Sequence, residues 1–244
     1  MRFSSLSTVL ALSALQAVAS PTQPDLAPRA TPTVYLCGDS TMANRGANDG
    51  ATDGWGQYFG TYSTVTVVNK AIGGRSARSL DTMMEARLGR MTTAVPTALG
   101  TGTETCISDK TGEVVYTFVF YVIQAAKLMT AKGATVVLSS QTPNNLWETG
   151  AFVGAPPRFV GYQLTAQKAL SSSSVTFVDH FQAVANTYRK IGNSATNALY
   201  PRDHTHTSPQ GASLVAQAFT QAIYQSMNGT TSLKSYIKNP PTVY

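Results

Sequence analysis

The chain has 244 residues, of which 43% are hydrophobic and 12% are charged, and this length and composition suit one α/β domain of ordinary size. Its formal net charge is +6 at pH 7, yet the basic residues are scattered and form no runs interleaved with aromatic side chains. That distribution argues against a nucleic-acid-binding protein. The excess of positive charge either serves solubility or favours a polyanionic substrate.

The amino terminus has the pattern of a secretory signal peptide. Arg2 supplies a positive charge, residues 9–18 are mostly apolar, and Ala17-Val18-Ala19 offers the small side chains that precede a cleavage site. We assign residues 1–19 to a signal peptide and the proline-rich residues 20–32 to a flexible leader. The apolar run is too short to span a bilayer, and no later run is long and apolar enough. We therefore expect a secreted, extracellular protein without a membrane anchor.

The first predicted strand, Thr33–Leu36, leads into a turn at Gly38, and Ser40 follows that turn. A glycine turn after a strand places the next side chains at the carboxyl edge of a sheet, where they are exposed and rigidly held. A catalytic nucleophile needs both properties. Alternatively, Ser40 only caps a backbone amide in an ordinary strand-to-helix turn. The string Gly38-Asp39-Ser40 alone does not decide between the two.

The next segments predict an alternation of strands and helices. Residues 44–53 form a polar loop, in which Thr52 or Asp53 is placed to cap the short helix that follows. The β-branched residues 64–69 predict a buried strand, and residues 71–76 form a second glycine turn at its end. This order predicts a parallel, doubly wound sheet.

The middle of the chain has weaker signals. Residues 80–99 have some helical character, and residues 100–112 form a polar loop. Residues 114–123 combine the β-branched and aromatic side chains of a strand with the apolar period of a helix. We give the period more weight and predict a helix that starts at about residue 116 or 117 and ends at Gly133 as a C-cap.

The remaining segments continue the alternation. Strands are predicted over residues 134–140 and 175–178, and helices from Pro157 to 170, over 181–191, and from the capping pair Ser208-Pro209 onward. The domain thus extends over residues 33–228, and the polar tail 229–244 is expected to be loose. Asn228 begins the string Asn-Gly-Thr and is a candidate N-glycosylation site.

The chain contains two cysteines, which is few for a secreted protein. Cys37 lies inside the first apolar strand and is expected to be a small buried side chain, whereas Cys106 lies in a polar loop. A disulfide between them stays possible, but a strand interior is a poor partner for a loop thiol. We expect Cys106 to be unpaired.

The string Asp203-His204-Thr205-His206 lies between the last predicted strand and the last predicted helix. A carboxylate three residues before an imidazole can hold the proton on one ring nitrogen, so that the other nitrogen accepts a proton from a serine hydroxyl. His206 would then be the general base and Asp203 its orienting group, at the same sheet edge as Ser40. In the alternative, both histidines are solvated and Asp203 caps a turn.

The histidines do not predict a metal site. His204 and His206 alternate across an extended loop, His180 is the only other histidine, and no cysteine stands at ligand spacing. We therefore expect neither a metal ion nor another cofactor.

Several strings resemble the SGNH (GDSL) hydrolases and, more closely, the fungal rhamnogalacturonan acetylesterases. They are Gly38-Asp39-Ser40-Thr41, Asp53-Gly54-Trp55-Gly56, Gly73-Gly74-Arg75-Ser76, Ser139-Ser140-Gln141-Thr142-Pro143-Asn144-Asn145, Trp147-Glu148-Thr149-Gly150 and Asp203 to Pro209. The resemblance covers residues 33–79 and 125–211, which is most of the chain after the leader.

The resemblance implies a three-layer α/β/α fold of the flavodoxin-like kind around a parallel sheet. It also implies a secreted serine esterase that removes acetyl groups from the rhamnogalacturonan of pectin without a metal. Carried over to this chain, Ser40 is the nucleophile, Asp203 the orienting group and His206 the general base. The backbone amides of Ser40 and Gly74 are two oxyanion donors. The expected partner is an acetylated pectic polysaccharide, with no nucleic acid and no membrane, and we expect a monomer.

One block of the family is missing from this chain. The family has a strand that ends in Gly-x-Asn-Asp, whose Asn is the third oxyanion donor, and residues 79–106 contain no such strand. We therefore expect the sheet to lack or replace one central strand, as in a shortened or mis-assembled version of an active esterase. The chain is then either an esterase or a catalytically impaired, carbohydrate-binding relative. A general lipase is less favoured, because the loops are polar.

Two further side chains are candidates for substrate binding. Trp147 could stack on a sugar ring, and Arg75 could pair with a uronate carboxylate. The alternatives are loop packing for Trp147 and a structural ion pair for Arg75, and we give these slightly more weight.

Overall fold

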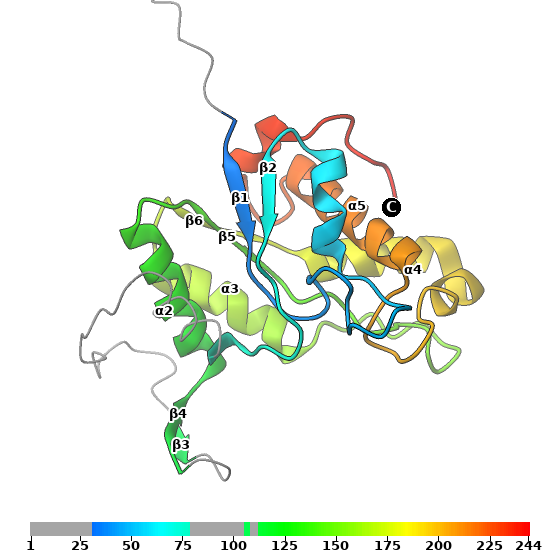
Figure 1. Cartoon of the computed structure of the whole chain (residues 1–244), viewed down its shortest axis with the longest axis horizontal. Helices are drawn as coiled ribbons and strands as arrows, with labels where there is room; N and C mark the ends of the chain where they lie inside the picture. The colour runs from blue at the N-terminus through cyan, green and yellow to red at the C-terminus, as the bar shows by residue number, and fades with distance from the viewer. Residues whose placement is uncertain (1–30, 79–104, 108–111) are drawn as a thin grey trace, which may run out of the picture. The chain divides into compact units, whose positions relative to one another are not determined.

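The computed structural model describes residues 31–78, 105–107 and 112–244 (Figure 1). The predicted signal peptide, nearly all of the leader and the whole helical segment 80–99 lie outside these residues. The side chain of Cys106 also lies outside them, so the prediction about its thiol is not tested.

Four of the strands form two separate parallel pairs. β1 (Thr33–Leu36) pairs with β2 (Thr66–Asn69), with Thr33 opposite Thr66. β5 (Val136–Ser139) pairs with β6 (Val175–Val178), with Val136 opposite Val175. Within the described part of the chain, no strand pairs with both β1 and β5. The parallel pairs agree with the predicted α/β class, and their separation agrees with the expected lack of a central strand.

A short antiparallel hairpin was not predicted. β3 (Thr105–Ile107) pairs with β4 (Val114–Tyr116), within a stretch that we expected to be loop up to residue 112. The strand propensity of residues 114–116 is thus realised, but only up to the helix boundary. Thr117 then caps α2 (Phe118–Ala131), since its side chain accepts a hydrogen bond from the Phe120 amide.

The other helices follow the predicted order. They are α3 (Arg158–Leu170), α4 (His180–Asn197) and α5 (Pro209–Gln225), with short 3₁₀ helices η1 (Trp55–Gln57), η2 (Phe59–Tyr62) and η3 (Ser232–Tyr236). Ser208 caps α5 as predicted, because its hydroxyl accepts from the Gly211 amide at 3.2 Å. No helix in the described part of the chain is long and apolar enough to cross a membrane.

Three local predictions were wrong or incomplete. Neither Thr52 nor Asp53 caps η1, because Thr52 donates to Asp49 and Asp53 accepts from the Tyr58 hydroxyl, while Gly54 stands at the N-cap. β2 is half-exposed rather than buried. The first helical stretch of α4 ends at residue 191 as predicted, before the non-helical Gly192 with a φ of 82°, but a second helical stretch that was not predicted follows to Asn197.

The carboxyl-terminal tail is packed against the domain rather than loose. The Thr64 amide donates to the Tyr236 carbonyl at 2.8 Å, and the Val243 amide donates to the Gln221 side chain at 2.7 Å. Apolar side chains among residues 233–244 also join the core. The prediction rested on the polar composition of the tail, which does not indicate the few residues that anchor it.

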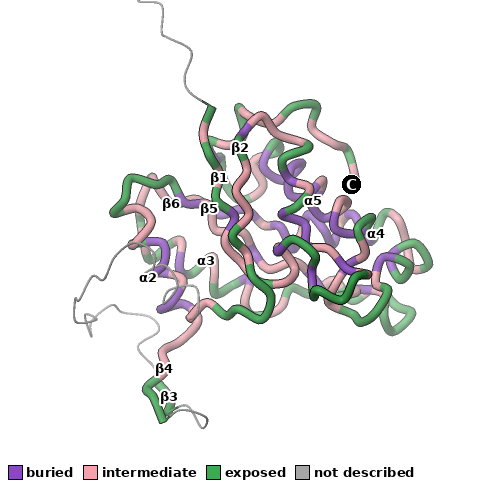
Figure 2. Tube along the Cα trace, viewed as in Figure 1, coloured by how far each residue is buried: buried purple, intermediate pink, exposed green. Residues whose placement is uncertain are grey.

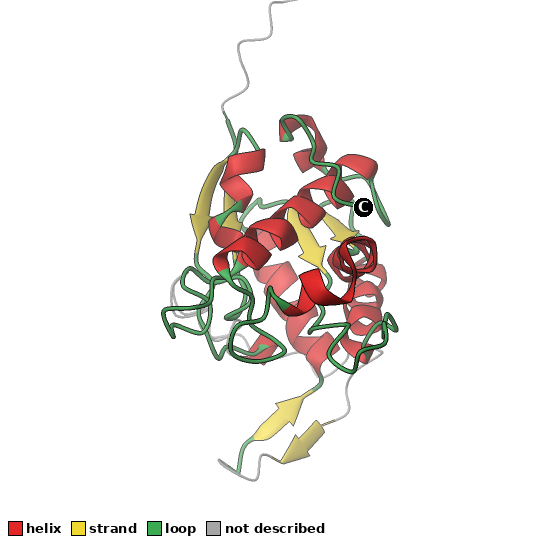
Figure 3. Cartoon of the chain, turned by 90° about the vertical axis from the view of Figure 1, so that its right-hand side faces the viewer, coloured by secondary structure: helices red, strands yellow, loops and turns green. Residues whose placement is uncertain are grey.

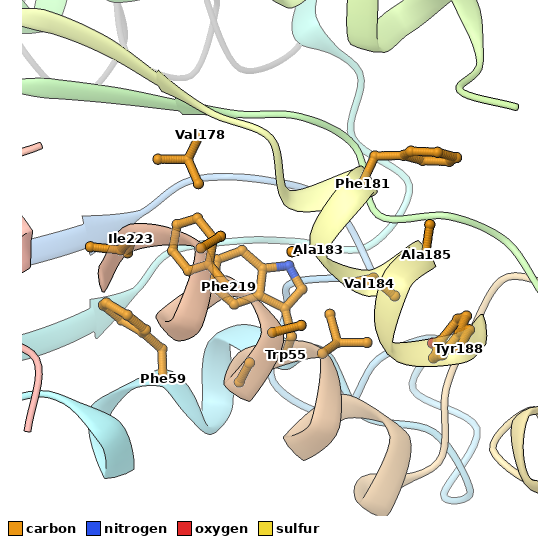
Figure 4. Close-up of a cluster of buried hydrophobic side chains, with 14 of the residues drawn as sticks. Trp55, Phe59, Val178, Phe181, Ala183, Val184, Ala185, Tyr188, Phe219 and Ile223 are labelled. Carbon is orange, nitrogen blue, oxygen red and sulfur yellow. The ribbon is translucent and has the colours of Figure 1, made fainter. Parts of the chain in front are cut away.

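The main core lies between η1, η2, β6, α4 and α5 (Figures 2 and 4). The ring of Trp55 lies 4.8 Å from that of Phe219 and 4.9 Å from that of His180, centroid to centroid. His180 is fully buried, and its Nε2 donates to the Val215 carbonyl at 3.0 Å. Burial lowers the pKa of His180 to about 4, against the opposing effect of that hydrogen bond, so the buried imidazole is neutral.

Candidate active site

Ser40 follows four residues after the end of β1 at Leu36. Loops gather at this end of the strands (Figure 3). Asp39 shapes the turn around Ser40. The Asp39 carbonyl accepts from the amides of Met42 and Ala43, and the Asp39 carboxylate accepts from both the amide and the hydroxyl of Thr41. The half-buried Ser40 side chain is therefore held by backbone geometry rather than by packing alone.

The structure brings Ser40 and His206 together across 166 positions of the sequence. The serine Oγ lies 2.8 Å from His206 Nε2, and His206 Nδ1 lies 2.8 Å from Asp203 Oδ2. A carboxylate only accepts hydrogen bonds, so the Nδ1 proton points to Asp203, and Nε2 of the neutral ring accepts from the serine hydroxyl. The order of donors and acceptors is that of a serine hydrolase triad.

Asp203 is held as an anion. Its other oxygen, Oδ1, accepts from the amides of Thr205 and His206, each at 2.7 Å. Burial by itself raises the pKa of Asp203, but the hydrogen bonds from the His206 ring and from the two amides outweigh it and lower the pKa to about 2. The carboxylate therefore stays charged throughout the neutral range and orients the imidazole.

Two loops hold the segment that carries Asp203 and His206. On one side the Asp53 amide donates to the Thr207 carbonyl at 2.9 Å. On the other, the Asn145 amide donates to the His204 carbonyl at 2.7 Å, and His204 Nδ1 donates to Glu148 Oε1 at 3.2 Å. His204 thus points away from the triad and serves as an anchor.

The second glycine turn lies against the serine. A Cβ atom placed on Gly73 would lie 3.6 Å from the Cβ of Ser40, and the Ile72 amide donates to the Gly38 carbonyl at 3.0 Å. Gly74 has a φ of 71°, in the left-handed region that favours glycine. The turn is thus next to the nucleophile position, and the oxyanion role of the Ser40 and Gly74 amides stays a prediction.

Asn69 is a structural residue of the site that the sequence interpretation missed. Its Nδ2 donates to the Met42 carbonyl at 2.9 Å and to the Asn44 side chain at 2.8 Å, so it ties the end of β2 to the loop after Ser40. An Asn at the last position of a predicted strand, just before a glycine turn, was the available signal. Since this amide is fully used, it does not replace the missing oxyanion Asn.

The remaining candidates lie outside the triad. Arg75 is exposed on the glycine turn and forms no ion pair with the described residues. The Trp147 ring packs on Phe152, and its Nε1 donates to the Tyr188 carbonyl at 2.9 Å, which favours the packing role.

The glycosylation candidate Asn228 is exposed, but its Nδ2 donates to Asp179 at 3.1 Å, so glycosylation there would replace that bond. No cluster of three metal-ligating side chains occurs among the described residues.

The chain is similar in sequence to two known proteins, although no family profile matches it. A rhamnogalacturonan acetylesterase of Emericella nidulans is 40% identical over 222 residues, which cover 78% of this chain and 84% of the relative. A probable rhamnogalacturonan acetylesterase of Bacillus subtilis, YesY, is 24% identical over 206 residues, covering 78% of this chain and 91% of the relative.

A solved structure is similar in fold. The crystal structure of the Bacillus subtilis protein YxiM superposes with a TM-score of 0.60 at 22% identity and covers 80% of this chain, while the chain spans only 56% of that protein. The alignment with the Emericella relative also contains gaps, since its 222 positions exceed 78% of a 244-residue chain. Some positions of the alignment are therefore gaps in this chain, and the relative has residues there that this chain lacks.

Proposed function

Because the chain belongs to the rhamnogalacturonan acetylesterase family of SGNH hydrolases, which are carbohydrate esterases, we propose that it removes acetyl groups from acetylated rhamnogalacturonan, a polysaccharide of pectin. The observation that carries this proposal is the hydrogen-bonded chain from Ser40 through His206 to Asp203, with 2.8 Å at both steps. The names of both sequence relatives support the choice of substrate.

In the proposed first step, Ser40 Oγ attacks the acetyl carbonyl carbon while His206 Nε2 takes the serine proton. The carbonyl oxygen becomes an oxyanion, which the amides of Ser40 and Gly74 would stabilise. Asp203 balances the positive charge that appears on the imidazole, because it stays ionised and bonded to Nδ1.

The intermediate then collapses as the bond between the carbonyl carbon and the sugar oxygen breaks. His206 gives its proton to that oxygen, and the sugar leaves with a free hydroxyl. Water, deprotonated by the same imidazole, attacks the acetyl-Ser40 ester. Acetate leaves, and the proton returns to Ser40, so the enzyme is regenerated without a cofactor.

The signal-like residues 1–19 support secretion, which an insoluble plant polysaccharide would require of an enzyme that acts on it. Expression of the full chain in a fungal host tests this part. Recovery of a protein from the medium that begins near residue 20 is expected, and retention of the uncut chain in the cells would contradict secretion.

The experiment for the activity is acetate release from acetylated rhamnogalacturonan, measured for the wild type and for Ser40→Ala. Release by the wild type above that of the variant is expected. Equal rates for the two proteins would overturn the proposed activity. Acetylated xylan as a second substrate distinguishes a pectin esterase from an esterase of other polysaccharides.

A second candidate is a catalytically impaired relative that still binds carbohydrate. The separation of β1–β2 from β5–β6 favours it, because the family's third oxyanion donor comes from a strand between them. Binding of the polysaccharide with no acetate release would support this candidate. Turnover above the Ser40→Ala background would exclude it.

A further inference from the structure

A pocket of about 300 Å³ lies beside the loop that carries the triad base. This volume is at the lower end of the roughly 300–1,000 Å³ found for small-molecule sites. Among the residues that line it are Gln141, Asn144, Asn145, Leu146, Glu148 and Phe181.

The pocket adjoins the active site through shared residues. Asn145 and Glu148 line it, and both contact His204, which lies two residues before the triad base His206. An occupant would therefore contact the 141–149 loop, which holds the segment that carries the triad base.

The polar groups at the pocket are suited to hydroxyl groups. The side-chain amides of Gln141 and Asn144 form no hydrogen bond within the described residues, so their donors and acceptors are open to a ligand. Leu146 and Phe181 are buried and give the pocket an apolar floor. Open amides around an apolar floor are what a sugar ring requires, because it has hydroxyls at its rim and C–H groups on its face.

The charge at the pocket favours a neutral sugar over a uronate. No cationic side chain lines the pocket, whereas Glu148 contributes a carboxylate that is 57% exposed and accepts a hydrogen bond from His204. A uronate would meet this carboxylate without a compensating cation. Arg75, by contrast, is exposed on the glycine turn beside Ser40, and its guanidinium suits an acid.

We propose that this pocket is a subsite for a neutral sugar ring of the polysaccharide, on the loop that holds the triad segment. The inference rests on the proposed function for the identity of the polymer. In a chain that alternates rhamnose and galacturonate, the pocket would take rhamnose, whose ring is uncharged and carries an apolar methyl group. The polymer register at the triad would then be set by the neutral sugar.

Binding to the Ser40→Ala protein tests this subsite without requiring turnover. The probes are a deacetylated rhamnogalacturonan oligosaccharide and an oligogalacturonide of the same length, titrated by calorimetry. The first is expected to bind more tightly than the second. Gln141→Ala with Asn144→Ala should raise the Kd of the first probe about tenfold, because each lost hydrogen bond is worth roughly 0.5–1.5 kcal/mol.

Gln225→Ala is the matched control, since Gln225 is an exposed amide at the end of α5, away from the pocket residues. It should leave the Kd unchanged. Asn144→Ala alone, at an exposed position, serves if the double variant fails to fold. Equal Kd values for both probes, no binding of the first probe, or an unchanged Kd in the variants would each overturn the subsite.

The outcomes also separate this inference from the proposed function. Absence of acetate release by the wild type would overturn the esterase proposal, whatever the binding data show. Acetate release by the wild type together with an unchanged KM in the Gln141 and Asn144 variant would overturn the subsite alone.

Discussion

The two parallel strand pairs have very different surroundings. In β6 three of four residues are buried, and Phe177 and Val178 join the main core. In β1 only Leu36 is buried, and the side chain of Tyr35 is 64% exposed. Figure 2 shows this contrast along the tube. The half of the sheet that carries the nucleophile is thus the less buried half.

The geometry of the triad nevertheless survives, because loops anchored to the helical core hold it. The Trp55 amide donates to the Thr41 carbonyl, and the Gly54 amide donates to the Ala43 carbonyl. A Cβ atom on Gly54 would lie 2.3 Å from the Ala43 carbonyl oxygen, so only glycine allows this close approach. The active site therefore depends more on η1 and α5 than on a continuous sheet.

The largest expected effect is on the triad. Asp203→Asn should lower kcat by about 10⁴-fold, because the amide no longer fixes the imidazole in the tautomer that accepts from Ser40. Acetate release gives the rate, and thermal unfolding shows whether the fold is kept. Combining this change with Ser40→Ala should lower kcat no further than Ser40→Ala alone. A loss of less than about tenfold in Asp203→Asn would contradict the assigned role.

The second prediction compares the main core, which contains Trp55, with the exposed strand β1. Trp55→Ala should lower the free energy of unfolding by roughly 3–5 kcal/mol, because a buried aromatic ring leaves a cavity between Phe219 and His180. Tyr35→Thr, on exposed β1, should change it by about 0.5 kcal/mol or less. Urea titration measures both. Similar losses in the two variants would show that the β1 half is as tightly packed as the core.

The third prediction restores the missing element. A strand ending in the family's Gly-x-Asn-Asp block, inserted between residues 78 and 105, should pair with β1 and β5 and supply an oxyanion donor. Such a donor typically contributes about 10²–10³ in kcat. The insertion with its Asn changed to Ala is the control and should gain stability only. An unchanged kcat in the Asn-containing insertion would contradict a catalytic deficit in this chain.

The fourth prediction concerns pH and the buried His180. The folded imidazole takes up a proton only near pH 4, whereas the unfolded one does so near its ordinary value of about 6.5. Between these values the unfolded state binds more protons, so the free energy of unfolding falls as the pH is lowered from 6.5 to 4, by about 3 kcal/mol in total. Urea titrations across this range measure it.

His180→Gln is the control for that pH dependence. It keeps a side-chain donor for the Val215 carbonyl but does not titrate, so its stability should change much less between pH 6.5 and 4. A slope equal to that of the wild type would assign the pH dependence to other groups.

The smallest expected effect is at the anchor of the triad loop. Glu148→Ala removes the exposed hydrogen bond to His204 and should lower kcat less than about fivefold, as expected for an exposed polar contact worth roughly 0.2–1 kcal/mol. Glu148→Gln keeps an acceptor and should recover most of the rate. A loss above a hundredfold would mean that Glu148 acts in the chemistry itself.

The sequence predicted the features that depend on local signals. β6 begins and ends at the predicted residues 175 and 178, and Ser208 caps α5, because β-branched runs and capping residues act over a few positions. The three triad residues also came from short strings. Their mutual distances could not be derived, since they depend on how distant loops pack.

The features that the sequence did not predict depend on tertiary contacts. Asn69 was not singled out, because its role arises from the loop after Ser40 that lies against it. Gly192 has a positive φ that interrupts α4, and the chain becomes helical again beyond it up to Asn197. The tail was judged by its polar composition, whereas a few contacts, such as that between Gln221 and Val243, hold it.

The positions of the two tryptophans give each region its own fluorescence signal. Trp55 lies in the core with its ring edge-on to the neutral His180, and a protonated imidazole quenches indole emission strongly. Trp147 lies in the loop whose neighbours line the pocket, bonded to the Tyr188 carbonyl. In a Trp147→Phe variant, emission therefore reports the protonation and loosening of the core. In a Trp55→Phe variant, it reports the arrival of an oligosaccharide at the loop.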